Sequence, residues 1–329
     1  MGGGLMQLVA YGAQDIYLTG NPQITFFKVV YRRHTNFAME SVEQTFSGSP
    51  GAGSKSVATI SRNGDLVGRM YVEATLGAEN GSKKNANPGT ALIGEVVCEI
   101  GGQQIDKHTG AWMETWAQLT ESNSGAVSNA TSTNMTTGAY TPYQKMSASG
   151  GVDGANSANV GLIHVPLQFW FNRNPGLALP LIALQYHEVK VSVTFSPAGA
   201  HQNNTFPSTD PKLWADYIFL DTDERRRFAQ VSHEYLIEQV QSASFSTTKS
   251  MDLNFNHPVK ELIWTGVPDT SDDDVATTGA STPALVTAGN YKLVLNGHDR
   301  MAERDETYFT RTQVWQHHTG NGGLNVTDS

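Results

Sequence analysis

The chain has 329 residues, of which 39% are hydrophobic and only 16% are charged, with a formal net charge of −9. This composition supplies a packed core, while 32 scattered Gly and 13 Pro exclude collagen and long helical bundles. No dense cationic arm is present to neutralise phosphates, so direct nucleic-acid binding is not expected. The low charge favours a surface that is largely covered by partners.

Short strands dominate the first half of the chain. Apolar runs with β-branched residues predict them, and turns rich in Gly, Asn and Pro separate them. The predicted strands are 37–46, 55–61, 66–76, 92–100, 162–171, 187–195 and 214–220. Residues 111–120 have helical spacing and predict a short helix inserted in a loop. The pattern as a whole favours an all-β sandwich over a doubly wound α/β fold.

Two segments interrupt the strand pattern. Residues 122–160 are Ser, Asn, Thr, Gly and Ala with almost no core-forming side chains, which predicts a long loop projecting from the surface. Residues 221–230 are polar and compatible with a helix, and we place the domain boundary there.

Beyond that boundary β patterning resumes. The predicted strands are 234–246, 251–256, 259–266, 291–296 and 307–316. An eight-stranded jelly roll needs more strands than these, and an unpaired sheet edge is normally avoided. We therefore expect the second domain to be incomplete.

A search for reactive constellations finds none. The sequence has no Gly-x-Ser-x-Gly elbow, no phosphate-binding Gly-rich loop with a Lys, and no His-Glu-x-x-His helix. The ten His are dispersed, and the adjacent His317 and His318 would point to opposite faces of the predicted strand. We expect no enzymatic activity, no cofactor and no metal site.

Other surface features leave alternatives open. Asn-x-Ser/Thr sequons provide candidate glycosylation sites, but no secretory signal is apparent, so ordinary polar loop sequence is the favoured interpretation. They are at Asn80, Asn129, Asn134, Asn203 and Asn325. In the run Phe169–Phe171, a strand would direct at least one ring away from its own sheet, into neighbouring elements or against another subunit.

Several segments carry a more specific resemblance. Residues 8–37, LVAYGAQDIYLTGNPQITFFKVVYRRHTNF, closely resemble the start of the major capsid protein of nucleocytoplasmic large DNA viruses, the group of phycodnaviruses, iridoviruses and giant amoeba viruses. The likeness returns at 61–66 (SRNGDL), 99–108 (EIGGQQIDKH), 174–191 (NPGLALPLIALQYHEVKV), 216–239 (DYIFLDTDERRRFAQVSHEYLIEQ) and 254–258 (NFNHP). The segments 122–160 and 267–290 diverge.

The resemblance implies a double jelly roll, with two eight-stranded antiparallel sandwiches side by side and three chains in a pseudo-hexagonal capsomer. It divides the chain into an N-terminal arm (1–25), a first roll (26–222) with an exterior loop at 122–160, a linker (223–233) and a second roll (234–329). Family members continue past the region resembling 308–318, so we expect the second roll to be truncated.

The expected function is therefore structural: trimers that tile the icosahedral shell of a large DNA virus. Implied partners are two further copies in a homotrimer, neighbouring capsomers and minor capsid proteins, with the arm near an internal membrane. The expected location is the virion, after assembly in the host cytoplasm. The alternative is a lectin-like jelly roll that binds carbohydrate in a minor-capsid or attachment role.

The candidate trimer contacts lie in two segments that are apolar and rich in turns. They are Phe26, Phe27, Arg32, Arg33, Pro175, Leu177, Leu179 and Pro180.

Overall fold

The computed structural model describes residue 13 and the ranges 36–76, 87–122, 140–150, 161–197, 211–243, 250–264 and 290–320. By internal contacts the chain divides into Met1–Phe37 and Ala38–Ser329. The fold below is that of the second unit, with its first strand beginning at the boundary.

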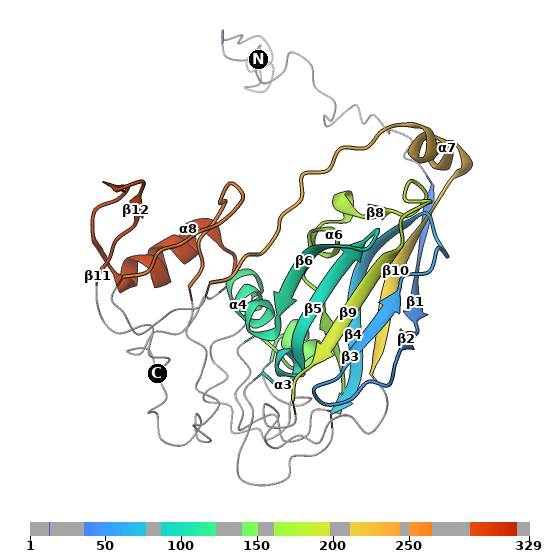
Figure 1. The fold of residues 1–329 in the computed structure, drawn as a ribbon, viewed down its shortest axis with the longest axis horizontal. Coiled ribbons are helices and arrows are strands. Elements are labelled where there is room, and N and C mark those ends of the chain that lie inside the picture. The colour runs from blue at the N-terminus through green and yellow to red at the C-terminus, as the bar shows by residue number, and fades with distance from the viewer. Residues whose placement is uncertain are drawn as a thin grey trace, which may run out of the picture. The chain divides into compact units, whose positions relative to one another are not determined.

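Ten strand segments build a two-layered sandwich (Figure 1). In chain order they are β1 (Phe37–Gln44), β2 (Phe46–Ser47), β3 (Lys55–Thr59), β4 (Leu66–Leu76), β5 (Ile93–Ile100), β6 (Gln103–Thr109), β7 (Gly161–Pro166), β8 (Leu179–Pro180), β9 (Val189–Phe195) and β10 (Lys212–Leu220). One sheet has the order β1-β10-β4-β7, with β8 also pairing β4, and the other has the order β2-β3-β9-β5-β6.

This strand order is that of a jelly roll. Eight of the ten segments have five or more residues: β1, β3, β4, β5, β6, β7, β9 and β10. In this set of eight, the first strand pairs with the last (β1 with β10), the second with the seventh (β3 with β9), the third with the sixth (β4 with β7) and the fourth with the fifth (β5 with β6). The described pairings are antiparallel, for example Val72↔Val165 between β4 and β7. Such an eight-stranded double sheet with two Greek keys is found in viral capsid domains, lectins and cupins.

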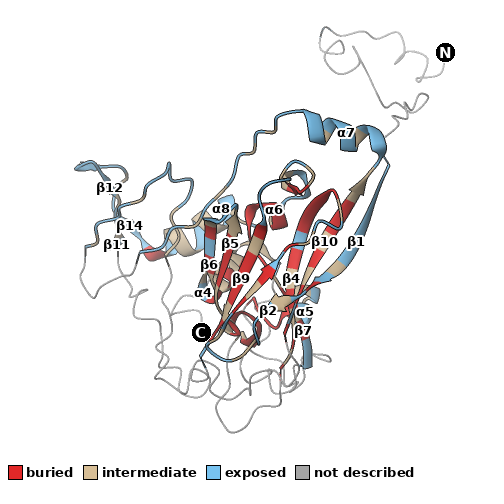
Figure 2. Ribbon diagram, turned by 45° about the vertical axis from the view of Figure 1, so that its right-hand side comes forward, coloured by how far each residue is buried: buried red, intermediate tan, exposed pale blue. Residues whose placement is uncertain are grey.

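The core fills the space between the two sheets (Figure 2). Alternate residues of β4, such as Met70 and Val72, point inward and are at most 1% exposed. They belong to one cluster with Val191 and Val193 of the facing strand β9. Burial of these apolar side chains is the main stabilisation of the sandwich.

Local sequence explains the connections. Gly101 and Gly102 both have positive φ, 61° and 81°, as the two-residue hairpin between β5 and β6 requires. Helix α4 (Gly110–Thr120) begins at Thr109, whose side chain accepts a hydrogen bond from the Trp112 backbone N–H. This helix confirms the prediction at 111–120. Six predicted strands are also confirmed, with each end within two residues of the observed one: 37–46, 55–61, 66–76, 92–100, 187–195 and 214–220.

The remaining helices are short. They are α3 (Pro88–Ala91), α5 (Pro142–Ser147), α6 (Trp170–Arg173), the 3₁₀ turn η3 (Pro175–Leu177), α7 (Thr222–Gln230), the π-helical segment η4 (Tyr308–Gln313) and α8 (Val314–His317). Four two-residue strands complete the described elements: β11 (Asn290–Tyr291), β12 (Val294–Leu295), β13 (His298–Asp299) and β14 (Arg304–Asp305). Helix α7 shows that residues 221–230, whose sequence is compatible with a helix, do form one.

The prediction of a projecting loop at 122–160 is wrong for residues 140–150, which the structure describes. There α5 begins with a capping box between Thr141 and Gln144, and Gln144 and Ser147 are fully buried. The Glu114 carboxylate of α4 accepts the Gly150 N–H at 3.0 Å and so fixes the end of this segment. This segment is thus held inside both by hydrogen bonds and by apolar burial, since Tyr140 and Ala148 belong to the core cluster.

The strand predicted over 162–171 ends early, at Pro166. The chain then turns into α6, and Phe169, Trp170 and Phe171 are all buried, with Phe169 stacked on Phe171 at 5.8 Å between ring centroids. No ring of this run is directed outward, because helical geometry replaces the alternation of a strand.

The prediction of a strand at 307–316 is also wrong, because that segment is helical (η4 and α8). His317 ends α8, and His318 follows it, so the two do not point to opposite faces of a strand. The stretches predicted as strands at 234–246, 251–256 and 259–266 contain no strand in their described residues.

Candidate assembly surfaces

The predicted contact residues fall into three groups. Phe26, Phe27, Arg32 and Arg33 lie outside the described residues, as do the five candidate glycosylation sites, Asn80, Asn129, Asn134, Asn203 and Asn325.

Among the others, Pro175 is exposed and Leu177 is half-buried at η3, so both remain available for a contact. Leu179 and Pro180 are buried in β8, where Leu179 belongs to the core cluster. Their assignment to a subunit contact is therefore corrected: their apolar character serves the core of their own domain.

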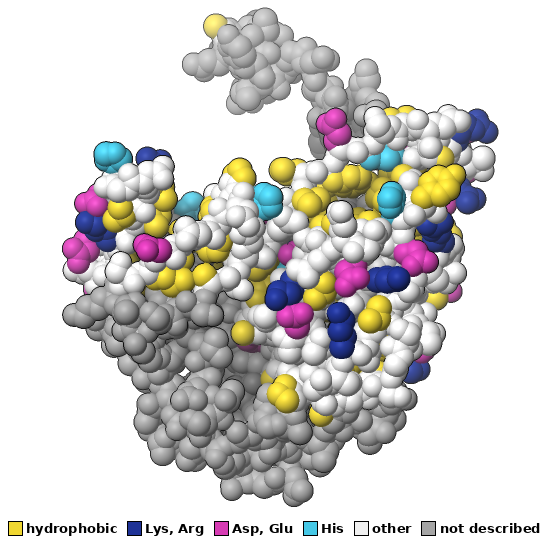
Figure 3. Space-filling view, in the orientation of Figure 1, with side chains coloured by type: hydrophobic (Ala, Val, Ile, Leu, Met, Phe, Trp, Pro, Cys, Tyr) yellow, Lys and Arg dark blue, Asp and Glu magenta, His cyan; other side chains and the backbone are white. Residues whose placement is uncertain are grey.

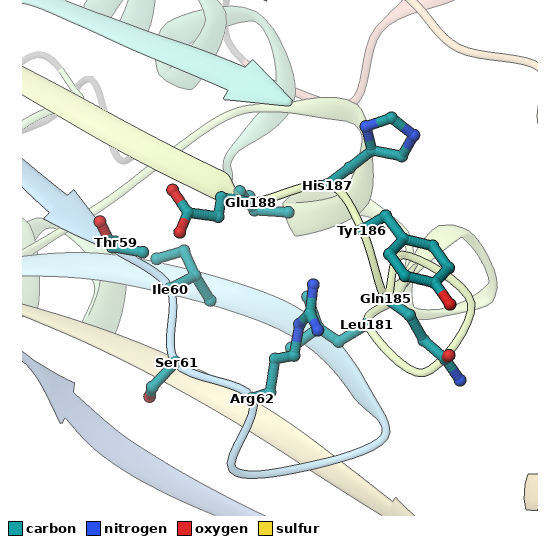
Figure 4. A pocket seen from close by; sticks show the side chains of 10 residues that line it. Thr59, Ile60, Ser61, Arg62, Leu181, Gln185, Tyr186, His187 and Glu188 are labelled. Atoms are coloured by element: carbon teal, nitrogen blue, oxygen red, sulfur yellow. The ribbon is translucent and has the colours of Figure 1, made fainter. Parts of the chain in front are cut away.

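At one end of the sandwich, an open hollow of about 430 Å³ lies between the β3–β4 and β8–β9 connections (Figure 4). We call it the Tyr186 hollow; it is lined by Thr59, Ile60, Ser61, Arg62, Leu181, Gln185, Tyr186, His187, Glu188 and Val189. Three apolar lining residues, Ile60, Leu181 and Val189, are each at most 4% exposed and so present little surface to the hollow. Its rim carries both charge signs. A second, smaller hollow of about 310 Å³ shares Tyr186, His187 and Glu188 with it.

The connection from β8 to β9 is held rigidly by backbone bonds. The N–H groups of Ala183 and Leu184 donate to the Pro180 carbonyl at 3.0 and 3.2 Å, and the His187 N–H donates to the Leu184 carbonyl at 3.2 Å. From the facing loop, the Arg62 guanidinium donates to the same Leu184 carbonyl at 2.6 Å. Tyr186 projects from this turn and is 93% exposed.

A second contact area lies along the outer edge of β6, where the chain beyond α7 is attached. We call residues 238–240 the edge segment. Gln239 Nε2 donates to the Ile105 carbonyl at 2.5 Å, and the Val240 N–H donates to Asp106 Oδ1 at 3.0 Å. Asp106 is 3% exposed, and its other oxygen is 2.8 Å from His108 Nε2. The edge segment thereby covers a strand edge that would otherwise be open to pairing.

Charges reinforce this attachment. Arg173 Nη2 is 2.6 Å from Glu238 Oε2, and Lys260 pairs with the same carboxylate. The hydrogen bond from Lys260, followed by the charge of Arg173, lowers the pKa of Glu238 despite its partial burial. The Arg173 guanidinium also lies 4.7 Å from the centre of the Trp116 ring.

The end of the described chain returns to α4. The Gly320 N–H donates to the Leu119 carbonyl at 2.8 Å, and the Thr319 hydroxyl donates to the Thr120 carbonyl at 2.5 Å. His318 lies edge-on to Trp116 at 6.1 Å. Segments on both sides of residues 265–289 are therefore attached to the first roll. Trp116 contacts both Arg173 and His318, a role that the sequence does not reveal because no local pattern distinguishes this residue from a core residue.

Several large apolar side chains stay exposed in the described second half. Leu236 is 86% exposed, Trp315 81%, Val231 54% and Val259 52%. On the face shown in Figure 3, charged side chains are scattered in small groups of mixed sign rather than gathered into one field. Exposed apolar area with few charges is typical of surfaces that associate with other proteins.

Within the described ranges, no three His, Cys, Asp or Glu side chains form a group able to hold a metal ion. The described helices include none that is long and apolar enough to cross a membrane. Cys98 is fully buried in β5, and burial raises its pKa to about 12, so its thiol stays protonated and unreactive.

The fold thus defines a jelly-roll protein whose described surface carries exposed apolar side chains suited to association with other proteins. A family model for the N-terminus of major capsid proteins matches residues 25–221, and one for the major capsid protein of large eukaryotic DNA viruses matches residues 224–322. The chain belongs to this family of viral major capsid proteins.

Individual relatives agree with this assignment. The chain is 52% identical to a major capsid protein of Pyramimonas orientalis virus over 327 residues, covering 97% of this chain and 76% of the relative. It is 42% identical to that of Paramecium bursaria Chlorella virus 1, over 96% of this chain and 78% of the relative. The crystal structure of PBCV-1 VP54, fitted into a reconstruction of the virophage Sputnik, matches with a TM-score of 0.69 and 38% identity, covering 91% of this chain and 78% of that one.

A chain in a quasi-atomic model of the PBCV-1 capsid matches with a TM-score of 0.65 and 37% identity, over 89% of this chain and 77% of that one. The fold class is accordingly that of the double jelly-roll capsid proteins, and the chain is a structural component of a viral capsid. The first roll is formed by the described strands β1 to β10.

Proposed function

We propose that the chain works without catalysis, as a homotrimer that forms a pseudo-hexagonal capsomer. Capsomers join one another and minor capsid proteins in a shell that encloses an internal membrane, and they assemble in the host cytoplasm. Three chains with two similar domains each present six comparable units around one axis, an outline that tiles a hexagonal lattice.

The observation that carries this proposal is the likeness to capsid chains over about nine tenths of the molecule, at 37% and 38% identity. The exposed apolar side chains support it from the physical side. Leu236, Val231 and Val259 leave apolar area in water that association would remove, at roughly 25 cal/mol per Å². A specific trimer contact needs about 1,000 Å² or more of buried surface.

The test is the mass of the purified chain in solution by light scattering, together with electron microscopy of the same sample. We expect three times the chain mass of 35.6 kDa and particles of hexagonal outline. A species that stays monomeric at high protein concentration, with no hexagonal particles, would contradict the proposal.

A further inference from the structure

We propose that a ring of contacts anchored on the first roll, the Trp116 latch, holds the chain beyond α7 and can release it as one unit while the first roll stays folded. We call the described residues beyond α7, which are 231–243, 250–264 and 290–320, the second half. The latch goes beyond the proposed function, and its test does not depend on trimer formation. Its side chains are Trp116, Arg173, Glu238, Lys260, Glu261 and His318.

The first observation is that the hydrophobic core ends with the first roll. Among the described residues, none beyond Phe228 belongs to either of the core clusters. Residues 232–243 form neither helix nor strand (Figure 1), and in this stretch Leu236 is 86% and Ile237 39% exposed. Apolar burial, the main stabilisation of the sandwich, therefore contributes little to holding the second half in place.

The second observation is that the second half is joined within itself. The rings of Trp264, Tyr291 and Phe309 contact one another, with 5.1 to 5.9 Å between their centroids. They come from three separate stretches of the chain, and aromatic pairs of this kind are stabilising beyond the area that they bury. The three stretches therefore move together rather than singly.

The third observation is that one residue of the first roll serves both ends of the second half. Arg173 Nη2 is 2.6 Å from Glu238 Oε2, and the guanidinium lies 4.7 Å from the centre of the Trp116 ring in α4. His318 lies edge-on to the same Trp116 ring at 6.1 Å. Arg173 thus reaches residue 238 directly and residue 318 through one ring.

Two polar contacts within the second half close the ring. Lys260 pairs with the Glu238 carboxylate, and its neighbour Glu261 is hydrogen-bonded to His318. The segments at 238 and 318 are thereby joined through residues 260 and 261. Loss of one contact in such a ring weakens the others, because each holds its neighbours in position.

The fourth observation is the close fit of residues 319 and 320 on the end of α4. The Gly320 N–H donates to the Leu119 carbonyl at 2.8 Å, and the Thr319 hydroxyl donates to the Thr120 carbonyl at 2.5 Å. The last carbonyls of a helix have no partner within it, so these bonds form without breaking others. A Cβ at Gly320 would lie 2.3 Å from the Gln118 carbonyl oxygen, so the fit leaves no room for a side chain.

These contacts are hydrogen bonds, ion pairs and ring contacts, and the side chains of Arg173 and Glu238 are partly exposed, so water can replace them. The second half can therefore leave the first roll without exposing the hydrophobic core, and its opening free energy lies below that of global unfolding. Such a release lets the two halves change their relation while chains associate, and the latch then fixes one arrangement.

The test is hydrogen exchange of the full chain at several low urea concentrations, followed by mass spectrometry. Two amides report on the latch: the Val240 N–H, which donates to Asp106 Oδ1 at 3.0 Å, and the Gly320 N–H. We expect both to exchange faster than the amides of β4 and with little dependence on urea, because the opening exposes little surface. Arg173→Gln should accelerate both by about fivefold or more, while the amides of β4 keep their rates.

Arg226→Gln, which removes an exposed Arg from α7, is the matched control and should change neither amide. Gly320→Ala tests the ring from its opposite end, since it changes no charge and pushes residues 319 and 320 away from α4. It should accelerate exchange at Val240 as well as at Gly320, because the ring holds the two segments together.

Three results would overturn the inference. Exchange of both amides only together with those of β4 would show that the second half does not release by itself. An unchanged rate at Gly320 in Arg173→Gln, or at Val240 in Gly320→Ala, would show two independent attachments instead of one ring. If Arg173→Gln unfolds the first roll, the β4 amides reveal it, and the result for Gly320→Ala decides.

Discussion

The hydroxyl of Tyr217 offers a direct test of what holds the first roll together. This residue of β10 is fully buried, and its hydroxyl donates to the Ser61 carbonyl at 2.6 Å and lies 3.1 Å from Gln44 Oε1. In Tyr217→Phe the ring and its packing remain. Gln44 Oε1 still accepts the N–H of Ser61 at 2.9 Å, but the Ser61 carbonyl loses its donor.

The loss is therefore one hydrogen bond and one acceptor left unsatisfied, which costs about 1–3 kcal/mol of unfolding free energy. For a domain of this size each kcal/mol lowers the melting temperature by roughly 2–4 °C. We expect a decrease of about 2–12 °C, measured by calorimetry or tryptophan fluorescence at one protein concentration, since association itself adds to the apparent stability.

Tyr186→Phe is the matched control, because it removes a hydroxyl that is already in water. Its effect on the unfolding free energy should stay within about 0.5 kcal/mol. The reasoning is refuted if Tyr217→Phe lowers the melting temperature no more than Tyr186→Phe does.

Two further changes test the attachment of the edge segment and the packing under α4. Since the folded pKa of Glu238 lies below its unfolded value, its ion pairs stabilise the attachment at neutral pH and lose that contribution as the pH falls through the folded pKa. After correction for the intrinsic pH dependence of amide exchange, the protection of residues 238–240 against hydrogen exchange should fall on acidification, and Glu238→Gln should lower it at neutral pH already; equal protection in both proteins at neutral pH would contradict this. Gly110→Ala would place a Cβ 2.2 Å from the Ile93 carbonyl oxygen and 2.3 Å from that of Thr90, so we expect little folded protein on expression. A soluble variant with unchanged melting temperature would show that this backbone approach is not needed.

The strands of the first roll were predictable because their inward positions are apolar. In β4 the period-two alternation predicts the strand to the residue, since one face of an antiparallel sheet packs on the core and the other does not. Strand β6 was missed for the opposite reason: its two buried positions carry Asp106 and His108, which pair with each other at 2.8 Å. A strand whose inward side chains are polar has no hydrophobic period to detect.

The candidate contacts were predictable only in part. The segment that contains Leu179 and Pro180 was identified as apolar and rich in turns, but its sequence does not show that these two residues point into the core while Tyr186 points into solvent. Likewise, residues 140–150 have no hydrophobic period, yet Tyr140 and Ala148 join the core, and Glu114 accepts a hydrogen bond from Gly150 across the fold.

By itself, then, the sequence determined what depends on local pattern: the all-β class, the positions of most strands, the helices at 111–120 and 221–230, and, through long stretches of resemblance, the family. Tertiary structure alone decided what depends on partners distant in the chain. It decided that the Phe169–Phe171 run turns inward as a helix, that the edge segment covers β6, and that Tyr186 stands beside an open hollow. The physical reason is that burial and hydrogen-bond partners are set by residues tens to hundreds of positions away, which periodicity within one segment cannot report.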